Sequence, residues 1–131
     1  MASQRLVHGW WEYQRRLHGN PEERRALEAG HPADVHLVFN EVKATIGAGG
    51  LRAWDLVVAL LDVAPGDHGV MLVGAGPLED LVKKHGDALV KEIEYDASRN
   101  DRVRQALSCV WVARGLLTPE VEGRLSRWIS S

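Results

Sequence analysis

The sequence predicts an all-α protein, folded as a single-domain helical bundle or as a HEAT-like stack of antiparallel helices. Apolar residues recur every three or four positions along most of the chain, which is the spacing of one helix face. Cap-forming residues or prolines precede several of these stripes, and glycines follow them. The length of 131 residues suits one domain and no linker-like segment divides the chain, so residues 1–131 are expected to form one helical domain.

Four helices are expected in the first half of the chain. A first apolar stripe covers residues 6–17. Asn20-Pro21 has the form of an N-cap followed by a first-turn proline, and the short charged helix that it opens is expected to end at Gly30. A third stripe covers residues 35–46. The glycine-rich segment 47–52 that follows lacks the Lys-Ser/Thr of a phosphate-binding loop and is interpreted as a flexible connector.

The fourth helix, over residues 51–63, is apolar almost all round and is therefore expected to be the most buried. Beyond it, the sequence predicts short helices over residues 77–86, 87–97 and 101–111, of which the first ends at a glycine and the others begin at an aspartate. Thr118-Pro119 has the form of a cap and first-turn proline that open the last helix. Such short helices with tight joints favour antiparallel neighbours.

The composition excludes several classes of protein. Hydrophobic residues make up 45% of the chain and charged residues 26%, a globular rather than a disordered mixture. The net charge of −2 does not favour nucleic-acid binding. Cys109 is the only cysteine, which fits a reducing compartment. The longest apolar run, residues 56–64, is interrupted by Asp62 and is too short to span a membrane. A cytoplasmic location is therefore expected.

Residues 70–96 invite comparison with a nucleotide-binding unit, in which a strand runs into a glycine-rich turn and then a helix. Two residues oppose that interpretation. Glu79 occupies the third glycine position of the motif and would place a negative charge beside a phosphate, and Pro77 removes a backbone N–H. The favoured alternative is a helix–helix joint in which Gly74 and Gly76 permit positive φ.

The six histidines do not form a recognisable metal-binding pattern. His31 and His36 are five positions apart, which misses the spacing that places two ligands on one helix face. No metal and no cofactor are expected.

Polar residues that border apolar stripes form a candidate cluster. Glu94 and Arg104 both lie beside inner faces, and a half-buried charge is costly unless paired, so we expect these two to form an ion pair, with Glu79 as a further candidate partner of Arg104. His85 continues an apolar stripe and should point partly inward. The complete cluster comprises Glu79, Asp80, His85, Glu94, Arg104 and Trp111.

A second candidate feature is a partner-binding surface. Residues 79–101 contain seven acids and four bases, an excess of three negative charges. The adjacent Trp10 and Trp11 cannot both face the core centre, so one is expected to flank it or to meet a partner, whereas Trp54 and Trp111 are expected in the core and Cys109 as an inert core thiol. The candidate surface comprises Trp11, Asp87, Glu92, Asp96 and Asp101.

The segment Gly76-Pro-Leu-Glu-Asp-Leu-Val-Lys-Lys-His-Gly86, followed by Ile93-Glu-Tyr-Asp-Ala97 and Arg104-Gln-Ala-Leu-Ser-Cys-Val-Trp111, resembles an uncharacterised family of small bacterial helical domains. The resemblance covers about residues 54–128. It implies a bacterial helical domain, and it suggests that the six residues of the polar cluster lie together.

Size, helical build and the acidic stretch favour a non-enzymatic bacterial protein-interaction domain. Its most concrete form is an immunity- or antitoxin-like protein that neutralises another protein, such as a toxin or effector, by covering its surface. A homo-oligomer stays open. The enzymatic alternative is a small hydrolase or transferase that uses His85 with Glu79, Asp80 or Glu94 in acid–base catalysis. A nucleotide-binding module at residues 70–96 is the third alternative.

Overall fold

The computed structural model describes residues 2–130, and their regular structure is helical apart from an isolated parallel bridge between Trp111 and Ser130. The prediction of an all-α protein is therefore confirmed. Along the chain the helices are α1 (Gln4–Leu17), α2 (Pro21–Glu28), α3 (Ala33–Ala48), α4 (Gly50–Asp62), α5 (Gly66–Val73), the π-helical segment η1 (Gly74–Leu78), α6 (Glu79–Ala97), α7 (Asp101–Leu107) and α8 (Pro119–Leu125).

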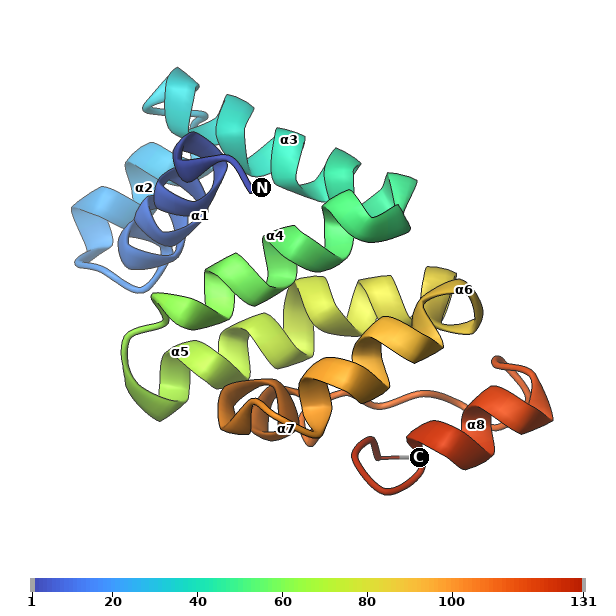
Figure 1. Ribbon diagram of the computed structural model, residues 1–131. Helices are drawn as coiled ribbons and strands as arrows, with labels where there is room; N and C mark the ends of the chain where they lie inside the picture. Colours follow the sequence, from blue (N-terminus) through green and yellow to red (C-terminus); the bar gives the residue numbers. More distant parts are fainter. Residues whose placement is uncertain (1, 131) are drawn as a thin grey trace.

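The helices stack in layers (Figure 1). α1, α2 and α3 form one end of the molecule, α4 lies beneath them, and the long run α5–η1–α6 lies beneath α4. α7 and α8 cover the opposite side of that run. One cluster of buried apolar side chains extends from Leu6 in α1 to Leu125 in α8, and α4 contributes six residues to it, as many as the longer α6.

The two caps that were predicted from a cap residue followed by a proline, Asn20 and Thr118, are confirmed. The Asn20 side chain accepts from the backbone N–H of Glu23, and the Glu23 carboxylate accepts in return from the N–H of Asn20. Thr118 caps α8 through its hydroxyl, which accepts from the backbone N–H of Val121. Two aspartates were expected at helix starts. Asp101 lies in the first turn of α7, whose cap is Asn100, and Asp87 lies inside α6.

The interpretation of residues 47–52 as a flexible connector is wrong. α3 continues to Ala48 and α4 begins at Gly50, so Gly49 alone separates the two helices. Its φ of +73° is the left-handed conformation that glycine adopts without strain. A Cβ at this position would also lie 2.6 Å from the ring of His85. The joint is therefore a tight corner that is packed against α6.

The expected breaks at residues 74–76 and at Gly86 are also absent. α5, η1 and α6 follow one another without a loop, and Gly74 has helical φ and ψ of −61° and −47°. Val70–Val73, the supposed strand of a nucleotide-binding unit, lies inside α5. The nucleotide-binding interpretation is therefore wrong. Gly86 lies within α6, where a Cβ would come 3.1 Å from Leu117, so this glycine permits close packing instead of ending a helix.

The C-terminal part departs from the prediction at one tryptophan. α7 ends at Leu107, and Trp111 is 53% exposed instead of belonging to the core. Cys109 is half-buried rather than enclosed. Trp54, by contrast, is 2% exposed, as expected. The apolar residues between Val103 and Trp111 have helical spacing, but α7 ends at Leu107 once Val103, Ala106 and Leu107 are buried. The spacing therefore placed Trp111 wrongly on the buried face of a longer helix.

Candidate functional site

Four residues of the predicted polar cluster lie on α6, and the continuity of that helix separates them. An α-helix turns about 100° per residue. Glu79 and Asp80 precede His85 by six and five positions, and Glu94 follows it by nine. Their side chains therefore leave the helix about 120–180° away from that of His85. The helix does not bring the three acids together with the imidazole.

Glu79 and Trp111 are the members of the cluster that meet. The backbone N–H of Trp111 donates to the Glu79 Oε1 atom at 2.9 Å. The Lys83 Nζ atom lies 3.9 Å from the same oxygen, which is the expected pair one helical turn apart. Glu79 thus holds the chain that follows α7 against the start of α6.

The predicted ion pair between Glu94 and Arg104 is wrong. Glu94 pairs with Arg124 of α8, whose guanidinium hydrogen bond lowers the pKa of the Glu94 carboxyl below its ordinary value. Arg104 pairs with Asp101 on its own helix and donates to the carbonyl oxygen of Ala97 at 2.6 Å. The reason is geometric, since α8 rather than α7 packs along the Glu94 side of α6.

His85 connects α6 to the end of α3. Its Nε2 atom donates a hydrogen bond to the carbonyl oxygen of Gly47 at 2.8 Å. The side chain is partly buried, as expected, and its ring packs on Gly49. The position of the imidazole is explained by the corner between α3 and α4.

Three of the four acids of the candidate partner surface have partners within the fold. The Asp96 carboxylate accepts from the indole N–H of Trp54 at 2.5 Å. Asp87 accepts from the backbone N–H and the hydroxyl of Thr118, at 3.0 and 3.2 Å, and so fixes the start of α8. Asp101 is held by the ion pair already described. These carboxylates therefore each join two parts of the fold or neutralise a neighbour.

The other two residues of that surface differ. Glu92 is half-buried, and its Oε2 atom is buried without a hydrogen-bond partner among the described residues. Trp11 flanks the core, as expected of one residue of the tryptophan pair, and its indole N–H donates to the carbonyl oxygen of Leu60 at 3.2 Å. Its neighbour Trp10 is 3% exposed.

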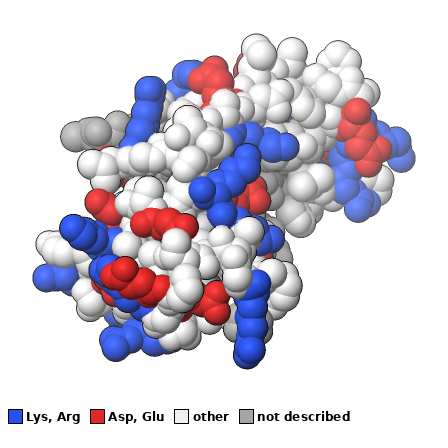
Figure 2. Space-filling model, turned by 90° about the vertical axis from the view of Figure 1, so that its right-hand side faces the viewer, with Lys and Arg blue, Asp and Glu red and all other residues white. Residues whose placement is uncertain are grey.

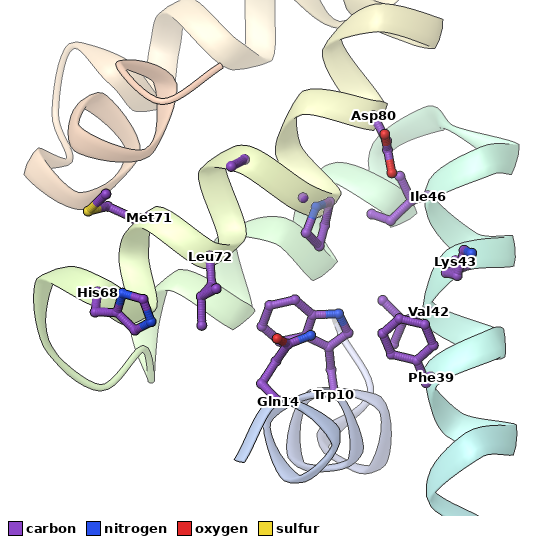
Figure 3. A pocket seen from close by; sticks show the side chains of 13 residues that line it. Trp10, Gln14, Phe39, Val42, Lys43, Ile46, His68, Met71, Leu72 and Asp80 are labelled. Carbon is purple, nitrogen blue, oxygen red and sulfur yellow. The ribbon is translucent and has the colours of Figure 1, made fainter. Parts of the chain in front are cut away.

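Sequence reasoning missed a hollow between the N-terminal helices and the α5–η1 run. A pocket of about 530 Å³ opens between α1, α3 and the α5–η1 run, and we call it the α1–α3–η1 pocket. Figure 3 shows Trp10 and Gln14 rising from α1, the α3 side chains forming one wall, and Leu72 with its neighbours forming the other. Its lining is Trp10, Gln14, Phe39, Val42, Lys43, Ile46, His68, Met71, Leu72, Ala75, Gly76, Pro77 and Asp80.

The aromatic lining of the pocket is held in place from behind. The ring of Phe39 stacks on that of Tyr13 with centroids 3.8 Å apart. Trp10 meets Trp11 edge-on at 4.7 Å, and Trp11 is itself fixed by its bond to Leu60. These contacts limit the rotamers of the lining side chains, so the pocket is formed before any ligand arrives.

A second hollow continues the first along α5. It has a volume of about 600 Å³, lies between α1 and α5, and shares Gln14, His68 and Leu72 with the α1–α3–η1 pocket. Trp11, Val63 and Pro65 supply its apolar lining. Because the two hollows have residues in common, they adjoin, and we call the two together the α5 groove.

A comparison with known protein families identifies the family of this chain. The model of a family of unknown function, DUF6869, matches residues 27–130. The chain belongs to DUF6869. No curated protein and no solved structure matches this DUF6869 chain. The expected resemblance to an uncharacterised family is confirmed, and the match begins within α2, well before residue 54.

The DUF6869 match covers only part of the residues that line the α5 groove. α3, α5 and η1 lie inside the matched residues, whereas α1, which supplies Trp10, Trp11 and Gln14, precedes them. The floor of the pocket is therefore contributed by a segment outside the family match. Apart from the tryptophan pair, no sequence pattern indicated this groove, because its walls come from distant parts of the chain.

The surface of this DUF6869 protein carries no field of one sign on the face shown in Figure 2. Acidic and basic side chains are intermingled over its lower half, and a region toward the upper right is mostly uncharged. Among residues 2–130, no helix is both long and apolar enough to cross a membrane. The same residues contain no group of three or more His, Cys, Asp or Glu side chains placed to hold a metal ion.

Proposed function

We propose that this DUF6869 protein acts by binding another protein and that the α5 groove is the docking surface. The observation that carries the proposal is the groove itself, an open apolar depression whose lining includes Met71, 50% exposed, beside aromatic rings. Aromatic residues and methionine are enriched in the buried centres of protein interfaces. Water in contact with such a lining is released when a partner covers it, which favours association.

The specific form that we propose is neutralisation of a bacterial toxin or effector in the cytoplasm, as immunity and antitoxin proteins do. Such a role needs a stable surface and no chemistry of its own. The positions of the candidate acids support it, because hydrogen bonds and ion pairs within the fold account for Asp87, Asp96 and Glu94. Catalysis through His85 is less well supported, because the hydrogen bond to Gly47 uses its Nε2 atom.

The test uses the products of the adjacent genes as binding partners and compares two substitutions. Met71→Glu introduces a charge into the groove, whereas Leu116→Glu does the same at a residue that is 51% exposed and lies outside it. We expect a neighbouring product to bind, with Met71→Glu weakening the complex by at least about tenfold and Leu116→Glu by less than about twofold.

Titration calorimetry of the purified proteins measures these affinities, and rescue of growth during co-expression tests neutralisation. Circular dichroism and the thermal midpoint of each variant confirm that the fold is retained. If no adjacent product binds, or if Met71→Glu binds as tightly as the unchanged protein, the groove is not the docking surface.

A further inference from the structure

The turn from α4 into α5, residues 62–68, is held by little apolar packing, and we call it the α4–α5 corner. Of these residues only Ala64 is buried, and the others are exposed. The corner also contains the end of α4, where the last carbonyl groups of a helix have no acceptor role inside it. A segment with few buried side chains depends on its polar contacts for local stability.

Arg102 of α7 supplies such contacts to the α4 end of the corner. Its Nη1 atom donates to the carbonyl oxygens of Leu61, Asp62 and Ala64, at 2.6, 3.2 and 3.3 Å. The positive guanidinium thereby lies at the negative end of the α4 dipole. Hydrogen bonds from a charged donor are about twice as strong as those between neutral groups, so this side chain is the main hold on the end of α4.

The same face of α7 holds the α5 end of the corner. α7 packs beside α5 (Figure 1), and the Gln105 Nε2 atom donates to the Asp67 carboxylate at 3.2 Å. Arg102 and Gln105 are three positions apart, which places them on one side of α7. A single helix therefore fixes both ends of the corner from outside.

The other side of the corner borders the hollow between α1 and α5. Val63 and Pro65 line this hollow together with Trp11. A Cβ on Gly69 would lie 2.8 Å from Pro65 and 3.3 Å from the Trp11 ring, so the ring lies close to the corner. Arg102 does not line the hollow. Displacement of the corner would thus uncover Trp11, although the side chain that prevents it is on another face of the molecule.

We propose that the α4–α5 corner is a gate of the hollow between α1 and α5 and that Arg102 holds the gate closed. The corner moves as a unit when the guanidinium releases its carbonyl oxygens, while the remaining helices stay folded. Contacts made at α7 therefore control access to the hollow. This inference goes beyond the proposed function, since it holds whether or not a protein docks in the α5 groove.

Amide hydrogen exchange of the whole protein, followed by NMR, tests the gate. The amides of Ala64 and Gly69 donate to carbonyl oxygens of the corner and its α4 neighbour. In Arg102→Gln we expect them to exchange at least about tenfold faster, the factor expected when a charged hydrogen bond is lost. The amide of Ile93, inside α6, should keep its rate. Arg24→Gln, at an exposed arginine of α2, is the matched control and should change none of these rates.

Two indole N–H signals show whether the hollow opens with the corner. The Trp11 indole donates to the carbonyl oxygen of Leu60 at 3.2 Å, and movement of the corner exposes it to water. Its exchange should accelerate in Arg102→Gln by a factor similar to that of the corner amides. The indole N–H of Trp54, which donates to a carboxylate of α6, should be unaffected.

Three results overturn the proposal. Unchanged exchange at Ala64 and Gly69 means that Arg102 does not hold the corner. Equal acceleration at Ile93 means that Arg102 supports the whole fold and that no separate gate exists. Faster corner amides beside an unchanged Trp11 signal mean that the hollow stays closed.

A second variant serves if Arg102→Gln does not fold. Gln105→Ala removes the other contact between α7 and the corner. It should accelerate exchange at Ala64 and Gly69 by a smaller factor, because the bond to Asp67 is exposed, and unchanged exchange in this variant overturns the gate as well.

Discussion

At the scale of single residues, Gly74, Gly76 and Pro77 are each explained by a different physical constraint. Gly74 lies against α7, and a Cβ there would approach the carbonyl oxygen of Ala106 to 2.3 Å. Gly76 precedes a proline inside a helix, a position where a Cβ would clash with the proline ring. Pro77 has no N–H to donate, and the wider π turn accommodates its ring. None of these reasons requires positive φ.

Gly74→Ala tests the first of them. The added methyl group meets backbone rather than a flexible side chain, so α7 must move, and we expect a loss of about 1–3 kcal/mol in the free energy of unfolding. Gly123→Ala is the matched control, because a Cβ at this α8 position meets nothing within 4 Å and should stabilise the helix slightly. Urea denaturation followed by circular dichroism measures both, and equal stability of the two variants would contradict the packing argument.

At the scale of elements, the sequence predicted the helix boundaries that depend on local hydrogen bonds and misread those that depend on packing. Asn20 and Thr118 were identified because a cap and its hydrogen bonds lie within four residues of one another. Gly74 and Gly86 were misread as breaks because their cause is a contact with Ala106 or Leu117, far away in the chain. A glycine required by packing and a glycine required by a turn look the same in a sequence without its structure.

The contact between α6 and α8 should depend on pH. The hydrogen bond from Arg124 lowers the pKa of Glu94, so the folded state binds the proton of this carboxyl less readily than the unfolded chain does. The stabilisation is therefore complete above the ordinary pKa of 4.5 and is lost as the pH falls through the lower value of the folded protein.

Glu94→Gln should accordingly lower the thermal midpoint at pH 7, and the difference from the unchanged protein should shrink toward zero in strong acid. Thermal denaturation of both proteins across this pH range measures the effect. Glu120→Gln, at the more exposed and looser partner of Arg124, serves as the control and should show a smaller difference. A gap that stays constant with pH would mean that Glu94 acts through packing alone.

At the scale of the whole molecule, the fold class followed from the sequence but the candidate site did not. Helical periodicity is repeated in every segment, so errors at single glycines leave the class unchanged. The α5 groove has no such redundancy, because its lining unites Trp10, Phe39 and Leu72 from three helices whose packing angles the sequence does not specify. The prediction of the polar cluster was wrong for the same reason. It assumed two helices that meet at Gly86, whereas α6 is continuous and places Glu94 on the side opposite His85.

The shared core predicts cooperative unfolding. Buried side chains from α1 and from α3 to α8 form one cluster, so removing one of these helices exposes the faces of others. We expect tryptophan fluorescence and far-ultraviolet circular dichroism to give coincident transitions in urea, since tryptophans lie near both ends of the chain as well as in α4. Two separated transitions would show that the N-terminal helices, which carry the floor of the pocket, unfold on their own.

The buried row Leu81, Leu89, Ile93 and Ala97 on α6 has a consequence for the tolerated length of the chain. These residues are spaced by multiples of four, so the row winds about 40° around the helix for every four positions and meets different neighbours in turn. One residue inserted near the middle of α6 would rotate all later contacts by about 100°. Insertions and deletions should therefore be confined to the irregular segment between α7 and α8, and α6 should keep a constant length when the rest of the chain changes.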